Sequence, residues 1–303
     1  MTRNLVITGV DGFVGRHLAR IAAEAGWDVF GVSRSTQVDA DLSASLSGYA
    51  SADLRQGWPD AAPTEAAIVH LAGLAAVGAS FDRPQDYIDG NSAMVTNMCE
   101  SLLKARDDAR IIGVSTGAVY AQRDDDPARS ERDPIAFTSP YVVSKILVEN
   151  QLAYYARRGL DTVVARPFNH IGPGQGPGFL LPDLLAQLRR IAPSEPLRVG
   201  DLTTRRDYTD VRDVARAYLA LAAAAELPDP VYNIASGVSR SGKELLAALC
   251  TATGTPQPRL TVDASRIRAT DPAIIVGDAT RLRDATGWAP LVPFDQTVTD
   301  AVG

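Results

Sequence analysis

A tyrosine and a lysine four residues apart, in the segment Tyr141-x-x-x-Lys145, are the side chains of this sequence best suited to proton transfer. If the segment is helical, both lie on one face, because residues i and i+4 are neighbours on a helix surface. An ammonium favours a nearby tyrosinate, so Lys145 is expected to lower the pKa of Tyr141. The pair therefore predicts a tyrosine that acts as a general acid or base near neutral pH. The spacing is also common by chance, and its meaning depends on where the fold places it.

A glycine-rich loop at the start of the chain predicts a bound dinucleotide. Gly9, Gly12 and Gly15 have the spacing G-x-x-G-x-x-G, after the apolar run Leu5–Thr8 and before an amphipathic stretch. Gly9 would allow a tight turn, Gly12 a close approach of the backbone to a pyrophosphate, and Gly15 the packing of helix on strand. Free N–H groups and the helix dipole at the start of the following helix then favour phosphate. A purely structural glycine turn is the alternative.

The end of the second strand indicates which dinucleotide binds. An acidic residue there would bind the ribose 2′-hydroxyl of NAD, but this sequence reads Ser33-Arg34-Ser35. An arginine pairs with a 2′-phosphate through its fork of donors, and the serine hydroxyls add hydrogen bonds. NADP(H) is therefore the preferred cofactor and NAD(H) the alternative, although Arg34 could also simply face solvent. Asp53 and Leu54 follow a third strand, so we expect them near the adenine.

Strands and helices alternate over much of the chain. Short apolar runs predict strands at Leu5–Thr8, Val29–Val32, Ala67–Leu71, Ile111–Ser115, Thr162–Ala165 and Val231–Ile234. Helical spacing of apolar residues predicts helices at Phe13–Ala25, Pro84–Ala105, Tyr141–Arg157 and Val211–Ala224. This alternation is typical of an α/β fold with a doubly wound parallel Rossmann sheet, and right-handed crossovers place helices on both of its faces.

This fold would bring the Tyr/Lys pair to the cofactor. The pair lies one helix after the strand Ile111–Ser115, whose carboxyl end presents Ser115 and Thr116. Ligands of parallel sheets bind at the carboxyl ends of the strands. The hydroxyls of these two residues are therefore expected to converge with Tyr141 and Lys145 on the nicotinamide.

The character of the chain changes after Arg166. Residues 167–178 contain four glycines and three prolines, which predicts a structured loop. Beyond it the expected helices are shorter and the strands fewer, so we predict a smaller C-terminal substrate-binding lobe. The dinucleotide-binding domain would take residues 1–166, with residues 211–236 returning to it. The lobe would take residues 167–210 and 237–303.

The composition argues against several classes of function. The net charge of −6 and the scattered basic residues argue against nucleic-acid binding, which needs clustered Lys and Arg. Cys99 and Cys250 are interpreted as buried apolar residues, and such sparse use is typical of a reducing cytoplasm. They lack metal-ligand spacing, so no metal site is expected. The chain enters its first strand without a signal peptide, and glycines and His70 interrupt its longest apolar stretch, so no membrane span is expected.

These motifs together resemble the extended short-chain dehydrogenase/reductase family, within its NAD-dependent epimerase/dehydratase group. The resemblance covers essentially the whole chain and rests on the glycine loop, His70-Leu71-Ala72, Ser115-Thr116 with Val119-Tyr120, and Tyr141-x-x-x-Lys145. It implies an enzyme that acts on a nucleotide sugar. By this resemblance Thr116 would hydrogen-bond the sugar oxygen at C4, Tyr141 would exchange that oxygen's proton, and Lys145 would also hold the nicotinamide ribose.

Four further segments are similar to the GDP-mannose branch of that family. They are Arg166–Gln175, Arg206–Val214, Ser80–Pro84 and Gly287–Pro290. By this resemblance Asn169, Arg206 and Arg268 would contact the substrate diphosphate, for which arginine forks are suited. Arg206 could instead form a surface ion pair with Asp207 or Asp210. His170 is interpreted as a buried, hydrogen-bonded residue and not as a catalytic one.

The loop chemistry and the resemblance together give the predicted site. The cofactor contacts are Gly9, Gly12, Phe13, Val14, Gly15, Ser33, Arg34, Asp53, Leu54, Leu71, Ala72, Gly73, Ser115, Tyr141, Lys145, Pro167 and Asn169. The catalytic residues are Thr116, Tyr141 and Lys145, and the substrate contacts are Thr116, Asn169, Arg206 and Arg268. The resemblance further implies a homodimer, formed by a four-helix contact of Pro84–Ala105 and Tyr141–Arg157.

The residues after Thr116 limit the reaction. A 4,6-dehydratase needs an additional acid and base, and family dehydratases carry a carboxylate two residues after the threonine. Here Gly117 and Ala118 follow, and neither side chain transfers a proton. Chemistry at C4 alone remains, as an NADPH-dependent reduction of a 4-keto sugar or as a 4-epimerisation with retained NAD. Ser33 and Arg34 favour the reductase, with GDP-4-keto-6-deoxy-D-mannose as the expected substrate.

A third class, a non-catalytic regulator that binds NADP, is less favoured. Such members of the superfamily usually lack the Tyr/Lys pair, which is present here. The base of the nucleotide follows from the resemblance alone. No residue of the predicted site distinguishes guanine from thymine or uracil by its own chemistry.

Overall fold

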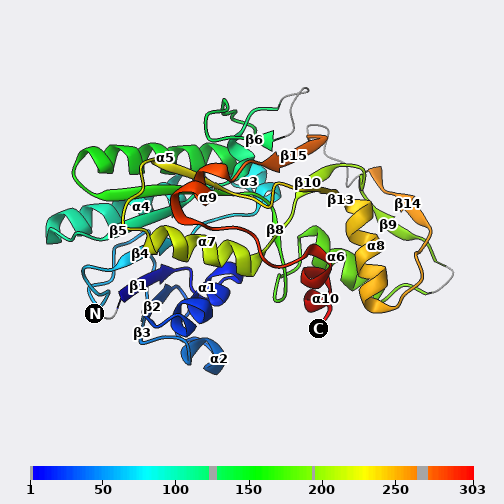
Figure 1. Ribbon diagram of the computed structural model, residues 1–303, viewed down its shortest axis with the longest axis horizontal. Coiled ribbons are helices and arrows are strands. Elements are labelled where there is room, and N and C mark those ends of the chain that lie inside the picture. Colours follow the sequence, from blue (N-terminus) through cyan, green and yellow to red (C-terminus); the bar gives the residue numbers. More distant parts are fainter. Residues whose placement is uncertain (1–2, 123–127, 193–194, 265–271) are drawn as a thin grey trace.

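A parallel seven-stranded sheet with the order β12-β7-β5-β4-β1-β2-β3 forms the centre of the molecule (Figure 1). The computed structural model describes residues 3–122, 128–192, 195–264 and 272–303. The strands of this sheet are β1 (Arg3–Thr8), β2 (Trp27–Ser33), β3 (Gly48–Ser51), β4 (Ala67–His70), β5 (Arg110–Val114), β7 (Asp161–Pro167) and β12 (Val231–Ile234). The predicted α/β fold with a doubly wound Rossmann sheet is confirmed.

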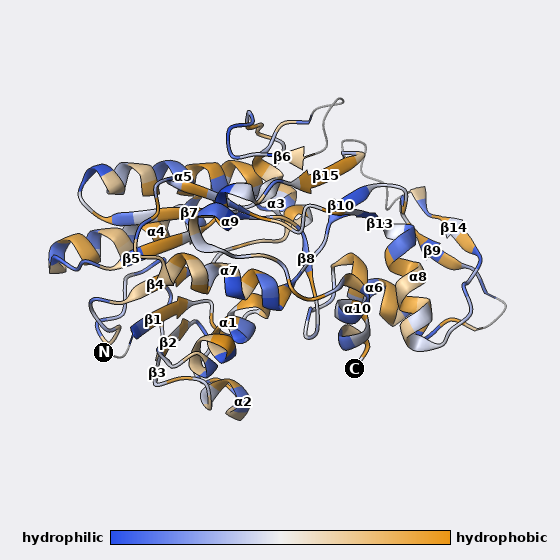
Figure 2. Cartoon of the chain, in the orientation of Figure 1, coloured by the Kyte–Doolittle hydropathy of each residue, from blue (hydrophilic) through white to orange (hydrophobic). Residues whose placement is uncertain are grey.

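Helices cover both faces of this sheet. The long helices are α1 (Phe13–Glu24), α4 (Pro84–Ala105), α5 (Pro140–Arg157) and α7 (Val211–Ala223). α1 packs with α7 on one face, and α4 packs with α5 on the other (Figure 1). Figure 2 shows that the strands between them are largely apolar, as expected for parallel strands that are buried on both faces. The strands and helices predicted from the sequence begin and end within two residues of the observed elements.

The strand order reverses between β1 and β4. From β1 the chain proceeds outward through β2 and β3, and it then returns to place β4 on the other side of β1. The loops after β1 and β4 therefore leave the sheet in opposite directions, and parallel sheets bind ligands in the crevice that this creates. The predicted dinucleotide loop lies at this point, between β1 and α1.

The C-terminal part of the chain forms small sheets and further helices. Helices α6 (Leu180–Leu188), α8 (Gly242–Thr253) and α10 (Phe294–Val302) contribute to a leucine-rich core. Short strands form a four-stranded sheet of β13 (Ser239–Ser241), β10 (Arg205–Asp207), β15 (Ile274–Gly277) and β6 (Ala128–Arg129), and two pairs, β11 (Thr209–Asp210) with β8 (His170–Ile171) and β14 (Leu260–Val262) with β9 (Leu197–Val199). The expectation of fewer strands here is wrong, because strands of two to four residues are too short to show a hydrophobic period.

Residues 211–236 contribute to the large sheet. α7 packs against α1, and β12 pairs in parallel with β7 at the sheet edge. The division into a dinucleotide-binding domain (1–166 with 211–236) and a smaller lobe (167–210 and 237–303) stays a prediction. The remaining short elements are α2 (Ala40–Ser43), α3 (Val77–Asp82), α9 (Thr280–Thr286) and the 3-10 turn η1 (Gly117–Val119). Within the described ranges, no helix combines the length and apolar character that a membrane span requires.

A fully buried carboxylate at the end of β10, that of Asp207, connects the four-stranded sheet to the loop after β12. It accepts hydrogen bonds from Ser236, at 2.8 Å from the backbone N and 2.6 Å from Oγ. The backbone N–H groups of Gly237 (2.9 Å) and Gly277 (3.3 Å) donate to it as well. Burial raises the pKa of Asp207, and these hydrogen bonds act in the opposite direction. One side chain thus satisfies backbone donors from two separate segments.

Replacement Asp207→Ala is expected to lower the free energy of unfolding by about 3 kcal/mol, because it leaves the N–H groups of Ser236, Gly237 and the buried Gly277 without their acceptor. Asp207→Asn keeps one carbonyl oxygen and should cost less. Denaturant unfolding followed by circular dichroism measures both losses. The exposed Asp284→Ala is the control and should stay within about 0.5 kcal/mol of the wild type. A loss for Asp207→Ala no larger than that of the control would contradict this role.

Candidate functional site

The turn between β1 and α1 leaves no room for side chains at its glycines. Gly9 has a φ of +67°, and a Cβ there would lie 3.0 Å from the backbone N of Ala72. At Gly15 a Cβ would lie 2.4 Å from the carbonyl oxygen of Gly9. Gly12 is the N-cap of α1, and the first turn of this helix contains no acidic side chain. The N–H groups at the helix start are therefore suited to a pyrophosphate, and this cradle fits the predicted dinucleotide.

Two adjoining cavities flank this turn. The first, which we call the adenosine cavity, measures about 300 Å³ and lies at the carboxyl ends of β2 and β3. The second, the catalytic cavity, measures about 370 Å³ and lies between the end of β5, α5 and the loop after β7. They share Gly9, Gly12 and Leu71, and every residue predicted to contact the cofactor lines at least one of them. The fold brings these residues together, while their contacts with a cofactor stay a prediction.

Arginines, hydroxyls and carboxylates meet in the adenosine cavity. Arg34 lines it beside Ser33, whose Oγ lies 2.8 Å from the hydroxyl oxygen of Tyr49. Asp53 lines it too, and Arg55 donates to both of its carboxylate oxygens, at 2.9 Å and 2.6 Å, which lowers the pKa of Asp53 to about 2. Because Arg55 compensates the charge of Asp53, Arg34 is suited to offer its own charge to a 2′-phosphate.

The three predicted catalytic side chains share the catalytic cavity. Tyr141 and Lys145 lie on consecutive turns of α5, and Thr116 follows the end of β5. The helix begins where the sequence favours a start, because Ser139 caps it and a proline occupies its first turn. Nζ of Lys145 donates to the carbonyl oxygen of Val114 at 2.8 Å. The fold therefore brings the pair and the strand-end hydroxyls to one place.

Burial has the largest effect on the pKa values of Tyr141 and Lys145. It raises the pKa of Tyr141 to about 12, and a hydrogen bond with Thr116 acts in the opposite direction. It lowers the pKa of Lys145 to about 8, against the effect of the Glu149 carboxylate. The expected net lowering of the pKa of Tyr141 is wrong, because the cost of burying a phenolate exceeds the effect of the hydrogen bond with Thr116. The Tyr141 hydroxyl is thus protonated at neutral pH, which is the form that donates a proton.

A buried ion pair behind the catalytic cavity is absent from the sequence-based predictions. Arg166 donates from Nε and Nη2 to the two carboxylate oxygens of Glu149, at 2.9 Å and 2.6 Å, and the hydroxyl of Ser115 donates to the same carboxylate. Nη1 of Arg166 also donates to the hydroxyl oxygen of Tyr120 at 3.0 Å, and that hydroxyl donates to Asn233 at 2.6 Å. Glu149 stands four residues after the lysine of the pair, so helical spacing could have identified it.

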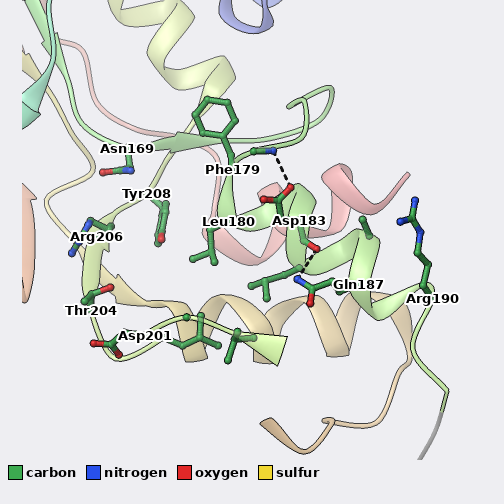
Figure 3. A pocket seen from close by; sticks show the side chains of 16 residues that line it. Asn169, Phe179, Leu180, Asp183, Gln187, Arg190, Asp201, Thr204, Arg206 and Tyr208 are labelled. Atoms are coloured by element: carbon green, nitrogen blue, oxygen red, sulfur yellow. Dashed lines mark hydrogen bonds between the residues drawn. The ribbon is translucent and has the colours of Figure 1, made fainter. Parts of the chain in front are cut away.

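A larger cavity, the distal cavity, lies between α6 and the loop of residues 199–208 (Figure 3). It measures about 860 Å³ and shares Asn169 and Phe179 with the catalytic cavity. Figure 3 shows Asn169 and Arg206 at one end, Arg190 at the other, and Asp183 of α6 between them. These residues all lie between Asn169 and Arg206 but belong to different elements, so no single motif indicates that they line one cavity.

Arg206 borders the distal cavity and is 9% exposed. Its Nη1 donates to two backbone carbonyl oxygens, at 2.8 Å and 2.9 Å. Asp210 pairs with Arg212 and Asp207 is held by backbone N–H groups, so neither of them forms the ion pair with Arg206 that the alternative named. The contact of Arg206 with a substrate diphosphate stays a prediction. Arg268, the remaining predicted substrate contact, lies outside the described residues.

A fourth cavity, the side cavity, measures about 220 Å³ and lies on the other side of η1. Gly117 and Ala118 line both this cavity and the catalytic cavity, and Arg206 separates it from the distal cavity. Its walls include the apolar side chains of Val77 and Phe81. Among the residues that the structure describes, no Asp or Glu lines either the side cavity or the catalytic cavity.

His170 and the cysteines have structural surroundings. Nδ1 of His170 lies 3.0 Å from the carbonyl oxygen of Phe168, and its ring stacks on Phe13 with centroids 6.1 Å apart. The hydrogen bond agrees with the interpretation of His170, but the residue is half-buried and lines the catalytic cavity. Cys99 and Cys250 are free and buried. In the part of the chain that the structure describes, no group of three or more His, Cys, Asp or Glu could hold a metal ion.

The sequence and the fold were compared with those of known proteins. Residues 5–235 match the model of the NAD dependent epimerase/dehydratase family. The chain is 32% identical to GDP-6-deoxy-D-mannose reductase of Pseudomonas aeruginosa, over 98% of this chain and 95% of the relative. The structure of RMD from Pseudomonas aeruginosa complexed with NADPH superposes with a TM-score of 0.83 at 30% identity, covering 99% and 98% of the two chains. UDP-glucose 4-epimerase of Thermus thermophilus in complex with NAD gives 0.85 at 25% identity, covering 99% and 97%.

Replacement Arg34→Ala is expected to weaken NADPH binding by about 10–100-fold, because a charge-assisted contact with the 2′-phosphate is lost. NADH lacks this phosphate, so its binding should change little. Calorimetric titration with both nucleotides measures the difference. Arg20→Ala, which removes an exposed arginine of α1 that pairs with Glu24, is the control. Equal losses for NADPH and NADH would contradict the assignment of Arg34.

Proposed function

The chain belongs to the NAD dependent epimerase/dehydratase family, and on this basis we propose that it reduces the C4 ketone of a nucleotide-activated 4-keto-6-deoxyhexose with NADPH. The observation that carries the proposal is the make-up of the catalytic and side cavities. They contain Thr116, Tyr141 and Lys145, but no Asp or Glu of the described ranges lines them. A 4,6-dehydratase needs a further acid and base beside the tyrosine, and these walls offer no carboxylate for that purpose.

The side chains of this cavity would supply the proton for the reduction. Tyr141 would donate its proton to the C4 oxygen, and the hydroxyl of Thr116 would hydrogen-bond the same oxygen. Lys145 would hold the nicotinamide ribose, and its ammonium would stabilise the phenolate that forms. NADPH supplies the hydride when bound. Burial raises the pKa of Tyr141 to about 12, so the tyrosine holds the proton that the reduction requires.

The adenosine cavity favours NADP(H) for this reaction. Arg34 and Ser33 offer a cation and a hydroxyl at the end of β2, where an NAD enzyme of this fold carries an acidic residue. The NADPH complex of the Pseudomonas aeruginosa structure supports this choice. NAD(H) is the alternative, because the carboxylate of Asp11 lines the same cavity and is a suitable acceptor for a 2′-hydroxyl. Ser35 already donates to that carboxylate at 2.6 Å.

The distal cavity is the proposed site of the nucleotide. With sugar C4 at Tyr141, the diphosphate would reach Asn169 and Arg206, and the base would extend toward α6. Guanine presents O6 and N7 to an arginine fork such as that of Arg190, and its N–H groups suit a carboxylate such as that of Asp183. Uracil and thymine place carbonyl oxygens on both sides of one N–H, which a carboxylate repels. The proposed substrate is therefore GDP-4-keto-6-deoxy-D-mannose, in agreement with the name of the Pseudomonas aeruginosa relative.

A nucleotide-sugar 4-epimerase with retained NAD is the second candidate. The similarity to UDP-glucose 4-epimerase of Thermus thermophilus favours it. The same Tyr141 and Lys145 would serve, but the tyrosine would first have to act as a base. The two candidates differ in the fate of the cofactor, because a reductase consumes NADPH and an epimerase restores its NAD in every cycle.

We also propose that the protein is a homodimer in the cytoplasm. α4 and α5 pack side by side, and Tyr154 of α5 is 54% exposed, so this aromatic side chain is available for contact with the same helices of a second copy. The free, buried cysteines support a reducing compartment. Size-exclusion chromatography with light scattering is expected to give the mass of two chains. A monomer mass at micromolar concentration would contradict the four-helix contact.

The proposed reaction is tested with purified protein, NADPH and GDP-4-keto-6-deoxy-D-mannose, and the expected outcome is oxidation of NADPH with formation of a GDP-6-deoxyhexose. If the ketone remains unreduced, the proposal fails. GDP, UDP and dTDP added as competitors test the base, and GDP should inhibit at the lowest concentration. Interconversion of GDP- or UDP-sugars without added cofactor would identify the epimerase instead.

In the same assay, Tyr141→Phe is expected to lower kcat by about 10²–10⁴-fold, because the proton donor is removed while the ring still fills its space. The Kd of NADPH should stay near that of the wild type. Tyr154→Phe removes an exposed hydroxyl from the same helix, and this control should retain full turnover. Unchanged turnover of Tyr141→Phe would count against the assignment.

A further inference from the structure

The end of β5 is held by two consecutive turns of α5. Lys145 donates from Nζ to the carbonyl oxygen of Val114 at 2.8 Å. One turn later in the helix, Glu149 accepts a hydrogen bond from the hydroxyl of Ser115, the next residue of the chain. Thr116 follows directly. An ammonium and a carboxylate of one helix thus hold the two residues that precede Thr116.

Glu149 itself is fixed from the neighbouring strand. Arg166 of β7 donates to both of its oxygens, at 2.9 Å and 2.6 Å, and the two side chains are only 7% (Arg166) and 12% (Glu149) exposed. With Ser115, the carboxylate accepts three hydrogen bonds, so it has little freedom to turn. A buried ion pair of this kind contributes little to stability compared with apolar residues of the same volume. Its position behind the catalytic cavity therefore suggests a functional role.

We propose that Glu149 is a positioning residue for the catalytic group. Through Ser115 it fixes the strand end that carries Thr116, and from one helical turn beyond Lys145 it supplies the negative charge that a buried ammonium requires. This inference rests on the proposed function, because it assumes that Lys145 must be protonated to stabilise the Tyr141 phenolate. It extends that proposal to a residue that contacts neither cofactor nor substrate.

The charged and titratable groups around the Lys145 ammonium identify Glu149 as the anion that matters. They are Tyr141 and Glu149 of α5, His70 of β4 and, beyond Glu149, Arg166 of β7. Burial lowers the pKa of His70 to about 3 and raises that of Tyr141 to about 12, so both are neutral at neutral pH. Burial lowers the pKa of Lys145 to about 8, and Glu149 acts against that decrease.

Nitrogen NMR of the lysine ammonium groups tests this inference without a substrate. Lysine occurs only at Lys104, Lys145 and Lys243, so ¹⁵N-lysine labelling gives three signals, which the K104R and K243R variants assign. In Glu149→Gln the titration midpoint of Lys145 is expected to fall by about one pH unit. Glu100→Gln removes a carboxylate of α4 that pairs with a surface arginine, and this control should leave the midpoint in place. An unchanged midpoint in Glu149→Gln would overturn the proposal.

A second variant separates this effect from misfolding. Glu149→Gln leaves Arg166 as an unpaired buried charge, which is destabilising. The double variant Glu149→Gln with Arg166→Gln removes both charges and keeps polar groups at both positions. Its Lys145 midpoint should also fall, since Glu149 is the charge that opposes the effect of burial on Lys145. A folded double variant with the wild-type midpoint would overturn the proposal.

Turnover gives an independent readout. Glu149→Gln is expected to lower kcat by about 10–100-fold, because the strand end is less precisely held. The KM for NADPH should change little, and the alkaline limb of the pH profile should move to lower pH, since the ammonium is lost earlier. An unmoved alkaline limb would overturn the charge role. If the wild-type protein reduces no 4-keto sugar, the proposed function fails, while the NMR titration still decides the role of Glu149.

Discussion

A lysine ammonium buried at the carboxyl end of β5 is the constraint on which the site depends. Only 7% of Lys145 is exposed, and a buried cation is tolerated only with acceptors and a compensating charge. The carbonyl oxygen of Val114 accepts a hydrogen bond from this ammonium, and the carboxylate of Glu149 compensates its charge. The end of β5 is therefore held next to α5. The loop after β4 also passes close to this ammonium, since a Cβ at Gly73 would lie 3.6 Å from its nitrogen. The catalytic cavity is thus enclosed by elements that pack around one charge.

The parts of this structure that the sequence predicts are those whose signals are local. Strands buried on both faces form uninterrupted apolar runs, and the glycine loop and the Tyr/Lys pair each lie within one short segment. Strands such as β10 and β15 are too short to show a period, and the distal cavity combines α6 with a loop that follows later in the chain. Glu149 lies between these cases, because helical spacing places it one turn beyond Lys145 but does not reveal that β7 supplies Arg166. The raised pKa of Tyr141 reflects burial, which a local motif does not show.

The loop after β7 connects the cofactor side of the site to the substrate side. Pro167 lines the catalytic cavity, and Asn169 borders the catalytic, distal and side cavities alike. His170, the next residue, stacks on Phe13 in the first turn of α1, beside the glycine loop. A ligand that extends from Tyr141 into the distal cavity would therefore pass along this loop. This arrangement gives a segment rich in glycine and proline fixed neighbours, with Phe13 on one side and the cavities on the other.

The protonation of the buried groups bears on the direction of the proposed chemistry. Burial favours the neutral phenol of Tyr141, so a ketone that arrives in the catalytic cavity meets a proton donor. Once the proton has moved, a phenolate remains in a site with little water, and it needs a nearby cation. Lys145 is that cation on the same helix face, and Glu149 opposes its neutralisation by burial. In the proposed reaction the phenol and the ion pair would therefore act at successive stages, because burial keeps the proton on Tyr141 before transfer and the ammonium would stabilise the phenolate after it.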